Sequence, residues 1–294
     1  MEKYKPIGIC AGALMIPWKL LSEHVKVEKN QEVDVYINIE GMLRNLTLEN
    51  RLTEIVSFYK SNVVIDMESS IINMVANYRS YFIREGAVPN IYLYYTSLGD
   101  HKQQMEVSNK YYRSYYRNKY TQNPNFRSMG ELVNKVIIPE TKLILSYVPK
   151  CYLVESKTFD GSIIPLIITN ETKRRGIIIS TDVFDTLYQY NPEITMIYVK
   201  RRYSNLKVYS DIDSIIQSIV KDVNPFDLTI FRSELYYRLL LAIKGSKIRN
   251  ITSAKGFGYG KFLKLIQDGI EKDLVLKDLE SIDSVIQLFP GVVS

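Results

Sequence analysis

The sequence feature that most constrains the fold is the stretch over residues 176–190, GIIISTDVFDTLYQY. The three isoleucines after Gly176 form a continuous apolar run bounded by turn-forming residues. Such a run is typical of a short strand buried on both faces, as in a parallel sheet. Asp182 and Asp185 follow the run, and α/β sheets bind ligands at the carboxyl ends of their parallel strands. The stretch therefore predicts a buried parallel strand with two acids placed where a ligand would bind.

Strands and helices alternate along the rest of the chain. Strands are predicted over 32–39, 91–95, 143–148, 151–154, 194–199 and 206–208, and helices over 51–59, 65–83, 132–136, 162–169, 235–244 and 261–267. Pro89 and Asn90 are expected to break the chain before the second strand. The crossover-length spacing predicts an α/β fold with a mainly parallel sheet. The predicted organisation is an N-terminal extension over 1–31, an α/β domain over 32–210 and a helical region over 211–294.

Composition indicates a folded protein with a polyanionic partner. The 294 residues are 46% hydrophobic and 24% charged, which is ordinary for a folded domain, and the net charge of +6 favours a polyanion. Two cysteines and two histidines argue against a disulfide scaffold or a zinc site, and they indicate a reducing, intracellular setting. The apolar residues 7–18 are interrupted by Pro17, so they are expected to pack on the domain rather than act as a signal peptide. No apolar run approaches the length of a membrane span, so no membrane partner is expected.

Acidic residues follow four of the predicted strands: Glu40, Asp100, Asp160 and the pair Asp182 and Asp185. The carboxyl ends of parallel strands share one edge of the sheet, so these acids are expected to converge. Clustered carboxylates repel one another unless a hard cation such as Mg²⁺ or Mn²⁺ neutralises them. Such a cation activates water and stabilises a phosphoryl transition state. A single acid is more often a helix cap or a turn residue, so the indication depends on all four strand ends.

Two segments have features that suit nucleic acid. Residues 101–120 hold five lysines or arginines and five tyrosines, which can contact phosphates and stack on bases, although a solvated amphipathic helix is the alternative. Residues 255–261, KGFGYGK, combine two lysines with glycines that let the backbone approach a phosphate. A flexible turn is the alternative for this second segment. Its candidate residues are Lys255, Gly256, Gly258, Gly260 and Lys261.

Taken in order, these motifs resemble those of the 5′-nuclease family, which includes phage flap endonucleases and the 5′→3′ exonuclease domains of bacterial polymerases. Residues 39–44 are similar to the first-strand IDG…R element, and 98–100 to the second metal-binding acid. Residues 115–119 resemble the YKxNR segment, 157–161 the EADD segment, and 179–187 the STD…DxDTL segment. Residues 241–251 are similar to KAIxGDxxDNI, and 255–261 to the glycine hairpin of a helix–three-turn–helix.

The resemblance implies a PIN-like central parallel sheet flanked by helices, a helical arch over about 101–130, and a C-terminal helix–three-turn–helix that binds DNA. It implies metal ligands and DNA-binding residues at defined positions. The implied metal ligands are Glu40, Asp100, Asp160, Asp182 and Asp185, and the implied catalytic residues are Asp100, Asp160, Asp185 and Arg117. The implied DNA-binding residues are Tyr115, Tyr116, Arg117 and Lys119, with Lys255, Gly256, Gly258, Gly260 and Lys261.

Several positions depart from the family pattern. Glu40 stands in place of an aspartate, and Tyr116 in place of a lysine. Five positions that carry acids in the family do not carry them here: Thr158, Gly161, Val183, Ser246 and Arg249. The first metal site is therefore largely retained and the second largely lost, which predicts Mg²⁺ or Mn²⁺ at one site, or no metal at all.

Three functions remain open from the sequence. The first is a DNA-binding member of the 5′-nuclease family with impaired catalysis, acting in phage replication or transcription complexes in the host cytoplasm. The second is an active Mg²⁺-dependent 5′ flap endonuclease or exonuclease. The third is a structural subunit of a viral assembly, whose tyrosine-rich surfaces contact other proteins. The expected partners are branched, flap or junction DNA and subunits of a viral complex.

Overall fold

The computed structural model describes residues 14–40, 42–43, 52–96, 133–157, 161–180, 194–200 and 205–209, together with Asp213, Ser214, Gln217 and Gly260. The chain divides into two compact units: Met1–Gln103 with Lys119–Asp211, and Gln104–Asn118 with Ile212–Ser294. Every helix and strand named below lies in the first unit. The domain boundaries near residues 31 and 210 stay predictions.

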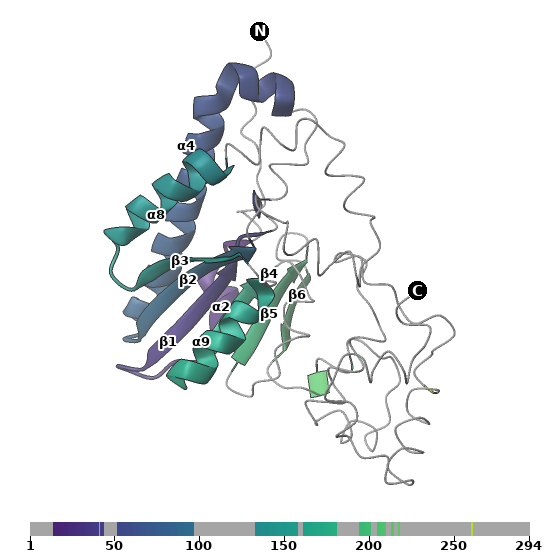
Figure 1. The fold of residues 1–294 in the computed structure, drawn as a ribbon. Coiled ribbons are helices and arrows are strands. Elements are labelled where there is room, and N and C mark those ends of the chain that lie inside the picture. The colour runs from purple at the N-terminus through teal and green to yellow at the C-terminus, as the bar shows by residue number, and fades with distance from the viewer. Residues whose placement is uncertain are drawn as a thin grey trace. The chain divides into compact units, whose positions relative to one another are not determined.

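A six-stranded sheet is the centre of the first unit (Figure 1). Its strands are β1 (Glu32–Asn38), β2 (Val88–Thr96), β3 (Cys151–Ser156), β4 (Gly176–Ser180), β5 (Ile194–Lys200) and β6 (Asn205–Tyr209). They lie in the order β3-β2-β1-β4-β5-β6. Every neighbouring pair is parallel except the antiparallel pair of β5 and β6. The predicted α/β fold with a mainly parallel sheet is confirmed.

The direction in which strands are added to the sheet reverses at β1. β2 and β3 lie on one side of β1, whereas β4 and β5 lie on the other. Ile37 of β1 pairs with Leu93 of β2 and with Ile179 of β4. Where the strand order reverses, the chains leaving two neighbouring strands turn apart, and ligands bind in the space between them. The carboxyl ends of β1 and β4 form this switch point, and Glu40 follows β1 there.

Helices cover both faces of the sheet (Figure 1). The helices are α2 (Trp18–His24), α4 (Leu52–Arg84), α8 (Ile138–Ser146), which a π-helical turn (Val133–Ile137) precedes, and α9 (Ile164–Thr172), which a 3-10 turn (Gly161–Ile163) precedes. Successive strand residues point to opposite faces, so Val33, Val35 and Ile37 join the core with α2, α4 and α8. Tyr36 points the other way and contacts Thr169 of α9. Burial on both faces explains the continuous apolar run of β4.

The N-terminal residues that the structure describes pack into the core. Leu14, Ile16 and Leu21 are buried. The hydroxyl of Tyr78 on α4 donates a hydrogen bond to the carbonyl of Leu14 and accepts one from the N–H of Ile16 at 3.1 Å. The described part of the predicted extension therefore packs on α4. No helix in the described ranges is both long and apolar enough to cross a membrane.

Two secondary-structure predictions in the first unit, one for a pair of helices and one for a strand, were wrong. The two helices predicted over 51–59 and 65–83 form the single 33-residue helix α4. Residues 143–148, predicted as a strand, are the end of α8 and the turn after it. Thr141 and Leu145 are buried four residues apart, while Leu143 is exposed. This helical spacing was hidden in a short apolar run, in which helix and strand patterns are hard to distinguish.

Pro89 does not break the chain but lies inside β2, opposite Val33 of β1. A proline lacks the N–H that a strand donates to its neighbour, and it is normally confined to strand starts and edges. β3 begins to pair with β2 only at Ile91. Pro89 is therefore tolerated because the strand has a neighbour on one side only at this point.

Candidate functional site

The strands β1 to β4 all end on a buried polar residue. These residues are Asn38, Thr96, Ser156 and Ser180. Thr96 of β2 stands directly opposite Ser156 of β3 in the sheet register. Buried polar groups need hydrogen-bond partners, so the carboxyl edge is a polar layer above an apolar core.

Glu40 is held in place by the helical turn that follows β1. Its N–H donates to the side-chain oxygen of Asn38 at 2.8 Å, as in the capping of a helix start. The N–H of Leu43 donates to the carbonyl of Ile39 at 3.0 Å, which closes the turn. Met42 and Leu43 are buried, so apolar packing anchors the turn that carries Glu40.

The carboxylate of Glu40 reaches across to β2. Its Oε2 atom accepts the O–H of Thr96 at 2.6 Å and the backbone N–H of the same residue at 3.2 Å. The shorter distance is in the range of hydroxyl–carboxylate hydrogen bonds, which are roughly twice as strong as neutral ones. Pairing of β1 with β2 ends where Asn38 faces Tyr94. The carboxylate therefore occupies the place where the next strand carbonyl would accept a hydrogen bond.

Gly161 joins the same group of contacts from the segment after β3. Its N–H donates to Oγ1 of Thr96 at 2.9 Å. A Cβ at this position would lie 2.8 Å from the carbonyl carbon of Tyr95 and 2.9 Å from the nitrogen of Thr96. Only glycine fits so close to a backbone. Because Gly161 follows Asp160 directly, the Thr96 hydroxyl links β1, β2 and the segment that carries a predicted acid.

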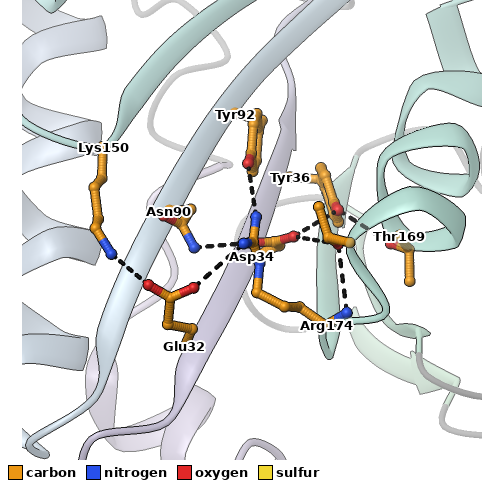
Figure 2. A network of polar contacts seen from close by, with 9 residues as sticks. Glu32, Asp34, Tyr36, Asn90, Tyr92, Lys150, Thr169 and Arg174 are labelled. Carbon is orange, nitrogen blue, oxygen red and sulfur yellow. Dashed lines mark hydrogen bonds and ion pairs between the residues drawn. The ribbon is translucent and has the colours of Figure 1, made fainter.

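A second polar network lies at the opposite, amino edge of the sheet (Figure 2). Its centre is the fully buried Asp34 of β1, which Arg174 contacts through Nε at 2.9 Å. Asp34 accepts three further hydrogen bonds, from Asn90 at 2.9 Å and from Tyr36 and Thr172 at 3.2 Å. Arg174 also donates to Glu32 at 3.2 Å and to the hydroxyl of Tyr92 at 3.3 Å, and Lys150 pairs with Glu32 at 2.5 Å.

The charges of this network neutralise one another. Hydrogen bonding and attraction from Lys150 lower the pKa of Glu32. Burial alone would lower the pKa of Arg174, but Asp34 and its other partners raise it overall. Burial raises the pKa of the Tyr36 hydroxyl, which therefore stays neutral. The network fixes the starts of β1, β2 and β4, and so it sets the register that places Glu40 at the other edge.

Tyrosines stack across three neighbouring strands beside this network. The rings of Tyr36 and Tyr92 are 5.2 Å apart, and those of Tyr92 and Tyr152 are 4.9 Å apart. Stacked cross-strand aromatic pairs stabilise a sheet. These three of the chain's 23 tyrosines therefore have a structural role.

No family model and no curated protein matches the sequence. Among solved structures, the bacteriophage T5 flap endonuclease co-crystallised with metal ions is similar, with a TM-score of 0.50 and 14% identity over 80% of this chain and 74% of its own. The chain shares the α/β fold of this T5 protein. The T5 5′-exonuclease with bound zinc has a TM-score of 0.47 and 15% identity, over 86% of this chain and 83% of its own. A T5 flap endonuclease complex with DNA and metal ions has the same score and identity, over 80% and 75%.

The resemblance to the 5′-nucleases is confirmed at the level of the fold, and two predicted site residues lie in the described part of the chain. Glu40 is at the carboxyl edge, and Gly260 is helical and exposed, with no atom within 4 Å of an added Cβ. The arch over 101–130 and nearly all of the helix–three-turn–helix lie outside the described residues. So do the other site residues: Asp100, Asp160, Asp182, Asp185, Tyr115, Tyr116, Arg117, Lys119, Lys255, Gly256, Gly258 and Lys261.

The donors at the carboxyl edge of the sheet suit a hard cation. They are oxygens, which Mg²⁺ and Mn²⁺ prefer. A carboxylate offers about four lone-pair positions, so Glu40 can accept both hydrogen bonds from Thr96 and still bind a cation. The described residues contain no group of three His, Cys, Asp or Glu that could hold a metal. A complete ligand set would therefore need the predicted acids that lie outside them.

Sequence reasoning missed Thr96, Asn38 and the other polar strand ends. Acids stand out as site residues in a sequence because carboxylates bind metals directly, whereas Ser, Thr and Asn at strand ends do not. A usable signal was nevertheless present, since four strands rich in apolar residues each end on Ser, Thr or Asn. Thr96 itself could not be assigned to Glu40, because their contact depends on which strands are neighbours.

Proposed function

We propose that this protein binds branched DNA with the 5′-nuclease fold, holds one divalent cation at the carboxyl edge of the sheet, and is impaired in cleavage. The observation that carries the proposal is Glu40, which two hydrogen bonds from Thr96 hold at the switch point; the same threonine accepts the N–H of Gly161, the residue after Asp160. Fixing a carboxylate in this way is useful to a cation site because it lowers the entropy lost on binding.

The chain's own acids support one cation rather than two. Glu40, Asp100, Asp160 and Asp185 would hold the ion, with Asp182 beside them. When bound, the ion would supply a Lewis acid that stabilises negative charge on a phosphate. Ser246 and Arg249 replace the acids that would hold a second ion. Two-metal phosphoryl chemistry loses much of its charge stabilisation without that second ion, so cleavage is expected to be slow or absent.

Charge and motif positions support DNA as the partner. The net charge is +6, and residues 101–120 and 255–261 concentrate lysine, arginine and tyrosine or glycine. The protein would then recognise flaps or junctions within a phage replication or transcription complex in the host cytoplasm.

An active one-metal nuclease is the second candidate. The hydrogen bond from Thr96 that fixes the Glu40 carboxylate supports it, because cleavage with a bound cation needs a fixed carboxylate as much as binding of the cation does. Arg249 would then supply positive charge in place of the second ion. This candidate predicts Mg²⁺- or Mn²⁺-dependent cleavage that Asp100→Ala and Asp185→Ala abolish.

Binding and cleavage of a labelled 5′-flap DNA test the proposal. At about 50 mM salt the protein should bind the flap, and the affinity should fall steeply toward about 200 mM salt. The double variant Lys255→Ala/Lys261→Ala should bind at least about 10-fold more weakly. The control Lys19→Ala/Lys142→Ala changes two exposed lysines and should bind like the wild type. Absence of flap binding at low salt would contradict the proposal, and metal-dependent cleavage lost in Asp100→Ala would favour the second candidate.

A further inference from the structure

We propose that Thr96 is a positioning residue for the cation site: its hydroxyl sets the orientation of the Glu40 carboxylate and the place of the backbone next to Asp160. The inference rests on the proposed function, because it concerns the affinity of the same site for a divalent cation. Thr96 does not itself bind the cation. It acts through Glu40 and Gly161.

The geometry gives the Thr96 hydroxyl a single orientation. Oγ1 accepts the N–H of Gly161 at 2.9 Å, and it donates its proton to Oε2 of Glu40 at 2.6 Å. A hydroxyl has one proton to donate, so the two contacts define a directed chain from Gly161 through Thr96 to Glu40. A shift of either segment would break one of these two hydrogen bonds, of which the one from Gly161 is buried.

The length of the Glu40 side chain explains why such a contact is needed. Glu40 stands where the 5′-nuclease pattern that the sequence resembles has an aspartate. A glutamate side chain has one more rotatable bond than an aspartate, so holding its carboxylate in one place costs more conformational entropy. Thr96 offsets this cost with one charge-assisted hydrogen bond from the hydroxyl and a longer one from the backbone at 3.2 Å. Thr96 is itself fixed, because it is buried and paired in β2 opposite Ser156. The carboxylate is thus preorganised by a rigid strand.

A purely structural reading assigns a different role to the same contact. Glu40 would then only cap the end of β2, where β1 no longer supplies a backbone carbonyl. Both readings predict that losing the hydroxyl lowers stability, since Gly161 would keep an unsatisfied N–H. Only the positioning role predicts that the hydroxyl also controls affinity for a cation, and only then should serine, which keeps the hydroxyl, restore that affinity.

Isothermal titration calorimetry of the whole 294-residue chain with Mn²⁺, at one fixed pH, tests the inference. Thr96→Val keeps the branched shape and should weaken Mn²⁺ binding by at least about 10-fold, as loss of a ligand-orienting hydrogen bond typically does. Thr96→Ser should stay within about 3-fold of the wild type. The matched control is Thr141→Val on α8, whose Oγ1 is buried and has no hydrogen-bond partner among the described residues. This variant should bind Mn²⁺ like the wild type.

The outcomes separate the inference from the function on which it rests. If Thr96→Val is folded and binds Mn²⁺ as tightly as the wild type, the positioning role is wrong and the capping role remains. If Thr96→Ser is as weak as Thr96→Val, the hydroxyl is not the group that matters, and the inference is again overturned. If the wild type binds no Mn²⁺, or if Glu40→Gln binds it equally well, the proposed cation site is wrong and the inference fails with it.

Discussion

At Gly161, the close packing of the segment after β3 against β2 determines which residue type can stand next to the candidate site. The 5′-nuclease pattern that the sequence resembles has an acid here, yet an added Cβ would approach the backbone of Tyr95 to 2.8 Å. The segment after β3 lies so close to β2 that a side chain is excluded. The missing acid is therefore part of how this chain folds, and it cannot be restored by substitution without moving the segment.

Gly161→Ala is predicted to lower the free energy of unfolding by about 1 to 3 kcal/mol, because the clash is with backbone atoms that cannot rotate away. Urea denaturation measures the change. Gly260→Ala is the matched control, since nothing lies within 4 Å of its added Cβ, and it should leave stability unchanged or slightly raised. Equal stability of Gly161→Ala and the wild type would contradict the close approach to β2.

Arg174 is the only cation that the structure places directly on the buried Asp34 within the described residues. Arg174→Met should destabilise the protein by about 3 kcal/mol, because it leaves a buried carboxylate without its ion pair. Lys150→Met is the control, since its ion pair with Glu32 joins side chains that are 39% and 42% exposed and should contribute less than about 1 kcal/mol. Thermal or urea unfolding of the two variants makes the comparison. Similar losses in both would show that Asp34 does not depend on Arg174.

At the scale of elements, α4 and α8 bring two acids together. Burial, followed by hydrogen bonding and repulsion from Glu140 on α8, raises the pKa of Glu68 on α4 from 4.5 to about 7. Between these two pH values the folded protein holds a proton that the unfolded chain releases. Stability from this group is therefore fully present below pH 4.5 and is lost as the pH rises through about 7.

Glu68→Gln should remove this pH dependence. The free energy of unfolding of the wild type should fall from pH 5 to pH 8 by about 1 kcal/mol more than that of the variant, after allowance for solvent screening. Urea denaturation at the two pH values measures the difference. Glu171→Gln, at an exposed position of α9, is the control and should keep the slope of the wild type. An unchanged slope in Glu68→Gln would rule out Glu68 as its source.

Elements buried on both faces could be predicted from sequence better than elements at the periphery. β4 was predicted correctly, because its continuous apolar run is bounded by turn-forming residues, as is typical of a strand buried on both faces. The end of α8 was misread because residues 143–145 form an apolar run too short to reveal its period. Strand neighbours are set by tertiary contacts, so the sequence could place Glu40 at a strand end but could not pair it with Thr96.

At the scale of the whole molecule, the strand order decides where chemistry can take place. The reversal of order at β1 puts the carboxyl ends of β1 and β4 side by side. The amino edge is occupied by a network whose charges neutralise one another. The carboxyl edge has the anchored Glu40, and β2, β3 and β4 also end there, each of them before a segment with a predicted acid. One edge of the sheet is therefore closed by a neutral network that stabilises it, and the other edge is where we propose that a cation binds.

The central claim, a single divalent cation at the carboxyl edge, is tested most directly by anomalous diffraction from crystals soaked in Mn²⁺. We predict one anomalous peak, at a ligand distance of about 2.1 Å from the Glu40 carboxylate. Crystals of the Glu40→Gln variant, soaked in the same way, should show that peak weakened or lost. Two peaks about 4 Å apart would indicate a complete two-metal nuclease, and no peak beside Glu40 would show that the edge holds no cation; either result would contradict the claim.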